Sequence, residues 1–191
     1  MTYLKALWLF ARPHTIVGTS LSVTALFIIA MAYADTSVLL WQDWLIALIS
    51  CLGANVYIVG LNQLTDIEID KINKPNLPLI SGLMSVKTGW TTIAASILIS
   101  LIFALAGGFY LAITVIISLF IGTIYSLPPI RLKRFHFWAA ACIFTVRGVV
   151  VNLFLFLHFH YLYSGSSDIP IHVWVLTGFV FGLSLVIAWF K

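Results

Sequence analysis

The sequence predicts an all-helical integral membrane protein, and three observations support this fold class. The chain has 191 residues, of which 62% are hydrophobic and only 8% are charged, and its mean hydropathy is +1.09. A soluble domain carries about 25% charged residues, so these side chains could not cover a globular surface. The chain also contains a series of apolar runs of about 20 residues, the length that a helix needs to cross a bilayer. Finally, the connections between these runs differ sharply in charge.

The apolar runs are expected to be helices because a bilayer offers no hydrogen-bond partner to backbone polar groups. They are too long and too uniformly apolar for the strands of a membrane barrel. The sequence AGG alone separates the third run from the fourth, and Pro128 and Pro129 end the fourth because proline cannot continue a helix. The six expected spans are Ile16–Ala34, Trp44–Leu64, Thr88–Ala106, Gly108–Leu127, Trp138–Leu157 and Ile171–Phe190.

The basic residues indicate the orientation of these spans. If each run crosses the membrane once, all Lys and Arg residues outside the spans fall on one side, whereas the opposite connections, ADTSVLLWQD and HYLYSGSSDIP, contain none. Cytoplasmic loops carry the excess of Lys and Arg, so both termini are predicted to be cytoplasmic. The residues on this side are Lys5, Arg12, Lys71, Lys74, Lys87, Arg131, Lys133, Arg134 and Lys191.

Half of the acidic residues gather at the cytoplasmic end of the second span. The chain has six Asp and Glu residues, and three of them are Asp66, Glu68 and Asp70. Asn62, Asp66 and Asp70 are spaced four apart, so on a continuous helix they project from one stripe. Glu68 lies between the two aspartates in sequence and points elsewhere.

Two interpretations of this stripe remain open from its spacing. The simpler one is a solvated helix end whose carboxylates pair with Lys71 and Lys74, as charge runs usually do. The other is a metal site, because two carboxylates on one face repel each other and a hard cation relieves that repulsion. Mg²⁺ is usually held by one or two carboxylates and completes its shell with water and substrate phosphates. Asp66 and Asp70, helped by Asn62, are therefore candidate Mg²⁺ ligands.

A basic connection, YSLPPIRLKRFHF, lies on the same side of the membrane as the acidic stripe. Arg131, Lys133 and Arg134 could be ordinary cytoplasmic anchors. Beside a metal site they are also candidate ligands of phosphate oxygens, which arginine forks and lysine ammonium groups commonly bind. Tyr125 at the start of the connection could donate a hydrogen bond. Together these residues are suited to a diphosphate ester at the membrane surface.

Arg147 is the one basic residue inside a span, in the sequence CIFTVRGVVVNLF. A charge at this depth faces the interior of a helix bundle or a water-filled cavity, and it pairs with another group. A role in an active cavity and a structural ion pair are both compatible with this position, and we treat Arg147 as a candidate catalytic residue.

The string NQLTDIEIDKINKPNLPLISG resembles the first aspartate-rich motif, N-x3-D-x3-D, of the intramembrane aromatic prenyltransferases of the UbiA superfamily. The strings DIEIDKINKPNLPL, YSLPPIRLKR, RPHTIVGT and VRGVVVNL are similar to its homogentisate prenyltransferase branch. The resemblance covers essentially the whole chain, and the extended strings are far more specific than the bare motif.

The resemblance implies a bundle of nine helices in which two aspartate motifs bind a prenyl diphosphate through Mg²⁺. It places Asn62, Asp66 and Asp70 in the first motif and suggests Lys74 as a further diphosphate contact, with Tyr125 and the basic connection. The second motif has no counterpart in this sequence. We therefore expect residues 1–191 to form a single incomplete domain, the first two-thirds of the bundle, that is inactive alone.

The implied reaction is the transfer of a phytyl-like group from a prenyl diphosphate to homogentisate, with decarboxylation, in tocopherol or plastoquinone biosynthesis. Inside the family, the acceptor could instead be a porphyrinoid alcohol or a naphthoquinone precursor. Outside it, a small transporter is the alternative, although the polar residues gather at one membrane surface. The expected partners are the two substrates and the lipid bilayer, and no nucleic acid.

Overall fold

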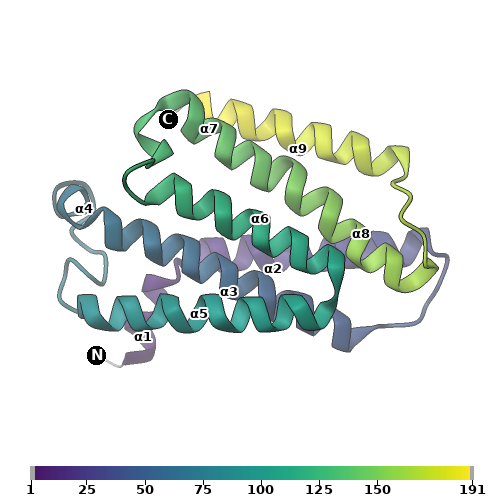
Figure 1. The fold of residues 1–191 in the computed structure, drawn as a ribbon, viewed down its shortest axis with the longest axis horizontal. Coiled ribbons are helices and arrows are strands. Elements are labelled where there is room, and N and C mark those ends of the chain that lie inside the picture. Colours follow the sequence, from purple (N-terminus) through teal and green to yellow (C-terminus); the bar gives the residue numbers. More distant parts are fainter. Residues whose placement is uncertain (1–2, 190–191) are drawn as a thin grey trace.

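The computed structural model describes residues 3–189, and the side chains of residues 3–186. All regular structure in residues 3–189 is helical, as predicted. The long helices lie side by side along the longest axis of the molecule (Figure 1). The helices are α1 (Tyr3–Phe10), α2 (Pro13–Tyr33), α3 (Trp41–Thr65), α4 (Ile67–Asn73), α5 (Val86–Gly107), α6 (Phe109–Ser126), η1 (Leu132–Arg134), α7 (His136–Phe144), η2 (Thr145–Val150), α8 (Val151–Ser164) and α9 (Ile171–Trp189).

Each of the six predicted spans coincides with a helix. Five helical stretches are long and apolar enough to cross a membrane: α2, α3, α5, α6 and the continuous stretch His136–Ser164. The sixth predicted span corresponds to α9, whose stretch Ile171–Val186 forms a shorter apolar helix. The predicted end of that span at Phe190, and the basic residue Lys191, lie outside the described residues.

The helix boundaries differ from the prediction by a few residues, for local reasons. Helix α2 begins at Pro13 rather than at Ile16, because proline is well suited to the first turn of a helix. Helix α5 begins at Val86 because the Ser85 hydroxyl oxygen accepts a hydrogen bond from the Thr88 backbone N–H at 3.0 Å. The fifth span is longer than expected because α7, the π-helical turn η2 and α8 continue one another from His136 to Ser164.

Helices α3 and α5 share the most extensive contact between two described helices, and small residues let their backbones approach. The Ser50 hydroxyl donates to the Ser100 carbonyl oxygen at 2.8 Å, and the Ser100 hydroxyl donates to the Ser50 carbonyl at 2.7 Å. A Cβ atom on Gly53 would lie 2.8 Å from the carbonyl oxygen of Ser96. Small residues that let helix backbones meet are typical of membrane helix pairs.

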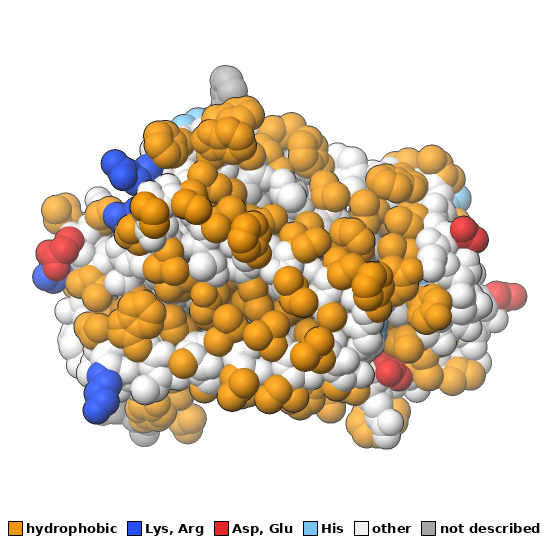
Figure 2. All heavy atoms as spheres, in the orientation of Figure 1, with side chains coloured by type: hydrophobic (Ala, Val, Ile, Leu, Met, Phe, Trp, Pro, Cys, Tyr) orange, Lys and Arg blue, Asp and Glu red, His pale blue; other side chains and the backbone are white. Residues whose placement is uncertain are grey.

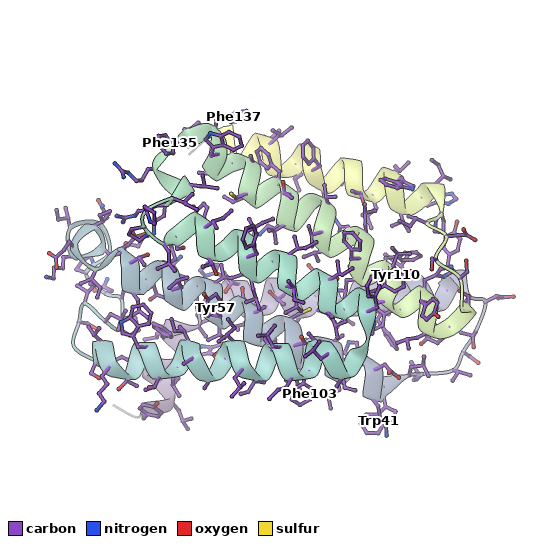
Figure 3. The ribbon with its side chains drawn as sticks, in the orientation of Figure 1. Trp41, Tyr57, Phe103, Tyr110, Phe135 and Phe137 are labelled. Carbon is purple, nitrogen blue, oxygen red and sulfur yellow. The ribbon has the colours of Figure 1, made fainter. Side chains whose placement is uncertain are left out.

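Further polar contacts tie α3 to its other neighbours. The Asn55 amide donates to the Thr15 hydroxyl on α2 at 3.0 Å, and the Tyr57 hydroxyl lies 2.9 Å from the Thr123 hydroxyl on α6. Figure 3 shows Tyr57 in the interior, whereas Trp41 and Phe135 lie near opposite ends of the bundle. Helix α3 is thus fixed on three sides, and its end is a rigid base for the side chains that follow it.

The N-terminal helix α1, helix α4 and the connection from α6 to α7 all lie at one end of the bundle (Figure 1). In the view of Figure 2, the Lys and Arg side chains gather at this end, whereas the charged side chains visible at the other end are acidic. We call the end that carries α4 and η1 the basic end. It brings the acidic cluster and the basic connection together.

Candidate active site

The acidic cluster does not lie on one continuous helix, so the predicted single stripe is wrong in this respect. Helix α3 ends at Thr65, and Asp66 takes a non-helical conformation with φ −114° and ψ 15° before α4 begins. In Figure 1, α4 is seen almost end-on while α3 lies lengthwise, so α4 crosses the end of α3. Asp70 therefore lies on a different axis from Asn62.

Side chains compete for the backbone groups at this break. The Thr65 hydroxyl donates to the Asn62 carbonyl oxygen at 3.1 Å, and the Asp66 N–H turns to the Gln63 carbonyl oxygen at 3.3 Å. Hydroxyl groups that bond to nearby carbonyls in this way compete with the helix. The Arg131 guanidinium also donates to the Thr65 carbonyl oxygen at 3.2 Å. Helix α3 thus ends at Thr65, the residue directly before Asp66.

The basic connection continues from the end of α6 and reaches this break. Arg131 has φ 41°, a left-handed conformation that costs an ordinary residue about 1–2 kcal/mol. Such conformations persist where the surroundings impose them, and they gather at functional sites. After Arg131, the short helix η1 directs Lys133 toward α3. A tight turn therefore places two cations at the end of α3.

Asp66 is the centre of the resulting charge cluster. Its Oδ1 atom lies 2.7 Å from Arg131 Nη2 and 2.8 Å from Lys133 Nζ. The three side chains are mostly buried, with exposed fractions of 14% for Asp66, 24% for Arg131 and 11% for Lys133. One carboxylate thus holds two cations that are more than 60 residues away in sequence.

Lys133 has two more oxygen partners. Its ammonium group donates to Asn62 Oδ1 at 2.8 Å and to Thr65 Oγ1 at 3.0 Å. Burial lowers the pKa of Lys133 below its ordinary value, and the hydrogen bond and charge of Asp66 oppose that shift.

The two other acidic residues of the cluster pair with lysines on their own helix. Asp70 Oδ1 lies 3.1 Å from Lys74 Nζ, and the Asp70 side chain is only 4% exposed. Glu68 Oε1 lies 2.7 Å from Lys71 Nζ, and both side chains are largely exposed. The pairing expected for a solvated helix end is therefore present for Asp70 and Glu68. Asp66 does not follow this pattern, because its partners Arg131 and Lys133 belong to the connection between α6 and α7.

A pocket of about 480 Å³ opens beside the charge cluster. It brings together seven of the nine predicted site residues, together with Ile69. The two others are Asp70, which is buried beneath the pocket's Lys74, and Arg147. The lining residues are Asn62, Asp66, Ile69, Lys74, Tyr125, Arg131, Lys133 and Arg134.

The residues around this pocket fit a magnesium ion in part. The Asn62 and Asp66 side-chain oxygens converge, because both lie 2.8 Å from the same ammonium nitrogen of Lys133. Asp70 Oδ2 is buried without a hydrogen-bond partner, so one carboxylate oxygen remains available beside Lys74. Within the described part of the chain, no group of three or more His, Cys, Asp and Glu side chains could hold a metal by itself. The set therefore suits a site that substrate oxygens complete.

Arg147 does not join this cluster. It lies in the π-helical turn η2 and its side chain is exposed. The Asn152 amide donates to the carbonyl oxygens of Arg147 and Gly148, both at 3.1 Å. Turns of this kind often mark functional positions in helices. The catalytic role of Arg147 remains a prediction.

Sequence reasoning missed Thr65 and Ile69. Thr65 bonds to both cations of the cluster, through its hydroxyl to Lys133 and through its carbonyl to Arg131. Its position directly before Asp66 was the available signal, but on the expected continuous helix it would point away from the aspartates. Ile69 lines the pocket because α4 turns across the end of α3.

The sequence of the chain matches a known protein family over most of its length. The model of the UbiA prenyltransferase family matches residues 21–191. The chain belongs to the UbiA prenyltransferase family. It is 47% identical over 198 residues to a homogentisate phytyltransferase from Synechocystis sp.. That match covers 100% of this chain and 63% of the relative, so the chain spans less than two-thirds of the relative's length.

Solved structures show the same fold. A digeranylgeranylglyceryl phosphate synthase superposes with a TM-score of 0.75 at 22% identity, over 99% of this chain and 61% of that chain. A UbiA homolog from Archaeoglobus fulgidus bound to GPP and Mg²⁺ superposes with a TM-score of 0.68 at 20% identity, over 94% of this chain and 60% of that chain. The chain is thus an integral membrane protein with the helical architecture of this family.

Proposed function

We propose that the pocket at the basic end binds a prenyl diphosphate with Mg²⁺ and serves the transfer of the prenyl group to an aromatic acceptor. One observation carries the proposal: four cationic side chains and the converging oxygens of Asn62 and Asp66 line the same pocket. The pocket can therefore receive a cation and a highly charged anion side by side. The likeness to a homolog bound to GPP and Mg²⁺ supports this assignment.

In this proposal each side chain has a distinct task. Asn62, Asp66 and Asp70 would hold Mg²⁺, and the ion would supply positive charge to offset that of the diphosphate leaving group. Arg131, Lys133 and Arg134, with Lys74, bind the phosphate oxygens, and Tyr125 donates a hydrogen bond at the pocket wall. The allylic cation left by the departing diphosphate is stabilised by aromatic faces.

Arg147 stands apart from these residues in the proposal. A charge at its depth requires water or an anionic partner, so we assign it to the polar part of the substrate cavity. The pocket at the basic end faces the cytoplasm, because Lys and Arg gather at this end and the positive-inside rule then places it there. We place both termini on the cytoplasmic side for the same reason, as the distribution of Lys and Arg in the sequence predicts.

Homogentisate is the acceptor that we propose, with a phytyl-like donor and decarboxylation, because the chain is 47% identical to a homogentisate phytyltransferase. A porphyrinoid alcohol or a naphthoquinone precursor remains the alternative acceptor inside the family. A transporter is less well supported, because the Lys and Arg side chains gather at one end of the bundle (Figure 2).

The direct test is binding of radiolabelled phytyl diphosphate to the chain in lipid nanodiscs. We expect saturable binding that requires Mg²⁺ and is lost in Asp66→Asn. Asp43→Asn, at the opposite end, is the matched control and keeps full binding. Binding that is independent of both Mg²⁺ and Asp66 would contradict the proposal. In the same samples, saturable binding of labelled homogentisate would support this acceptor, whereas saturable binding only of another acceptor would favour an alternative.

A further inference from the structure

The ammonium group of Lys133 lies among three side-chain oxygens. Nζ is 2.8 Å from Asn62 Oδ1, 3.0 Å from Thr65 Oγ1 and 2.8 Å from Asp66 Oδ1. The lysine side chain is only 11% exposed, so these contacts are shielded from water. Two of the three oxygens belong to residues assigned above to Mg²⁺. A cation of the protein itself therefore lies where those oxygens converge.

We propose that Lys133 is a tethered cation that fills the metal position of the resting site, so that Mg²⁺ enters together with the diphosphate and not before it. This inference rests on the proposed function. The ammonium group lies 2.8 Å from both Asn62 Oδ1 and Asp66 Oδ1, so it occupies the space in which a metal ion would bridge these two oxygens. Like charges a few ångströms apart also repel strongly in a partly buried site. Mg²⁺ alone must therefore displace Lys133 from the carboxylate of Asp66, which balances its charge in the resting site.

The diphosphate removes this obstacle. Lysine carries a compact charge on a flexible four-carbon stem, so Lys133 can turn from the aspartate to a phosphate oxygen without moving the backbone. Arg131 also bonds to Asp66 Oδ1, at 2.7 Å, and gains the same anionic partner. When the anion arrives, the oxygens of Asn62 and Asp66 become free for the metal. Binding of the two ligands is then coupled, and the coupling is reciprocal.

Thr65 is a positioning residue in this arrangement. Its hydroxyl is the third acceptor of the Lys133 ammonium group, and its carbonyl oxygen accepts from Arg131. Neither contact involves a residue that the resemblance assigns to metal binding. Thr65 thus holds the two cations in their resting positions without using the metal ligands.

The test is metal binding in the absence of any phosphate. Mn²⁺, a paramagnetic substitute for Mg²⁺, is titrated into the 191-residue chain in nanodiscs and its binding is followed by electron paramagnetic resonance. We expect Lys133→Gln and Lys133→Met to bind Mn²⁺ about tenfold or more tightly than the unmodified chain, because the competing charge is gone. Methionine excludes the possibility that the glutamine carbonyl itself binds the metal. Lys87→Gln, an exposed lysine near the start of α5, is the control and leaves the affinity unchanged.

Equal or weaker Mn²⁺ binding in both Lys133 variants would overturn the inference. A second measurement needs no variant: acetylation of Lys133, followed by mass spectrometry, is expected to be unaffected by Mn²⁺ alone. Faster acetylation with Mn²⁺ alone would show that the metal displaces the lysine without an anion, and would equally overturn it. The proposed function fails separately, if Asp66→Asn binds Mn²⁺ with pyrophosphate as tightly as the unmodified chain.

Discussion

The two ends of the bundle carry the same number of acidic residues but use them differently. At the basic end, Asp66 and Asp70 are buried in ion pairs. At the opposite end, Asp35 and Asp168 are exposed, and the Asp168 carboxylate accepts a hydrogen bond from the nearby Ser166 hydroxyl at 2.8 Å. Among the described residues, no ion pair reaches the opposite end.

This difference separates a candidate site from a solvated surface. A carboxylate in water needs no partner, whereas a buried one must be paired with a cation or a metal. Asp66 has partners from a connection 65 residues away, which requires the bundle to assemble first. The contacts that distinguish the two ends are therefore long-range, and substitutions at matched positions can test the distinction.

The largest effect is expected from Asp66→Asn. The change removes the charge that opposes Arg131 and Lys133, and it removes a proposed metal ligand. We expect the Mg²⁺-dependent affinity for phytyl diphosphate to fall by about 100-fold or more. We expect the free energy of unfolding to fall by about 1–3 kcal/mol, because two shielded cations lose their counterion. Equilibrium binding and thermal unfolding in nanodiscs measure the two effects. Asp43→Asn at the opposite end should change neither the affinity nor the free energy of unfolding. An equal loss in this variant would mean that the acidic residues at the two ends do not differ in function.

Asp70→Asn is expected to have the next largest effect, but only on binding. Its partner Lys74 is half exposed, so the lysine can regain water when the charge is lost. We expect metal-dependent binding to fall by about 30-fold while the unfolding temperature changes little. Mn²⁺ titration with pyrophosphate and a thermal melt measure these quantities. A large loss of stability with unchanged metal affinity would mean that Asp70 serves only the fold.

Arg147→Met tests the middle of the bundle against both ends. Since Arg147 is exposed in η2, removing its charge should not lower the unfolding temperature. Under the proposed function it should weaken phytyl diphosphate binding by about tenfold, whereas Arg147→Lys should retain most of the affinity. If Arg147 is instead part of a structural ion pair, the unfolding temperature falls and the affinity stays the same.

Arg131→Lys keeps the positive charge and removes the guanidinium fork. The fork bonds to both Asp66 Oδ1 and the Thr65 carbonyl oxygen, and a lysine cannot hold both in the same geometry. We expect phytyl diphosphate affinity to fall by about threefold to tenfold, with metal dependence preserved. Arg134→Lys, on an exposed neighbour, is the control and should give a smaller loss. Equal losses in the two variants would mean that charge alone matters.

The sequence was sufficient for the spans and for most of the pocket residues, but not for their geometry. Hydropathy is a local property, so the helices could be located within a few residues. The helix break at Asp66 could not be located in this way, because the Arg131 side chain that donates to the Thr65 carbonyl oxygen there is 66 residues away in the sequence. Four-residue spacing predicted a shared stripe for Asn62 and Asp70, and the turn into α4 removed it. The π-helical turn around Arg147 also has no signal in hydropathy, and the amide that contacts its carbonyl oxygen belongs to Asn152, five residues further along the chain.

The smallest effect is expected from Glu68→Gln, which provides a control within the acidic cluster itself. Glu68 lies two residues from each aspartate, yet its side chain is 82% exposed and pairs only with Lys71, which is 54% exposed. An exposed pair of this spacing contributes about 0.3–0.5 kcal/mol, so the free energy of unfolding should change by no more than this amount. The affinity for phytyl diphosphate should stay within about twofold of that of the unmodified chain. A loss comparable to that of Asp70→Asn would mean that the net negative charge of α4, and not the position of each carboxylate, attracts the metal. If Glu68→Gln leaves the affinity for phytyl diphosphate unchanged while Asp66→Asn lowers it strongly, the binding function belongs to Asp66, the carboxylate that is paired with Arg131 and Lys133.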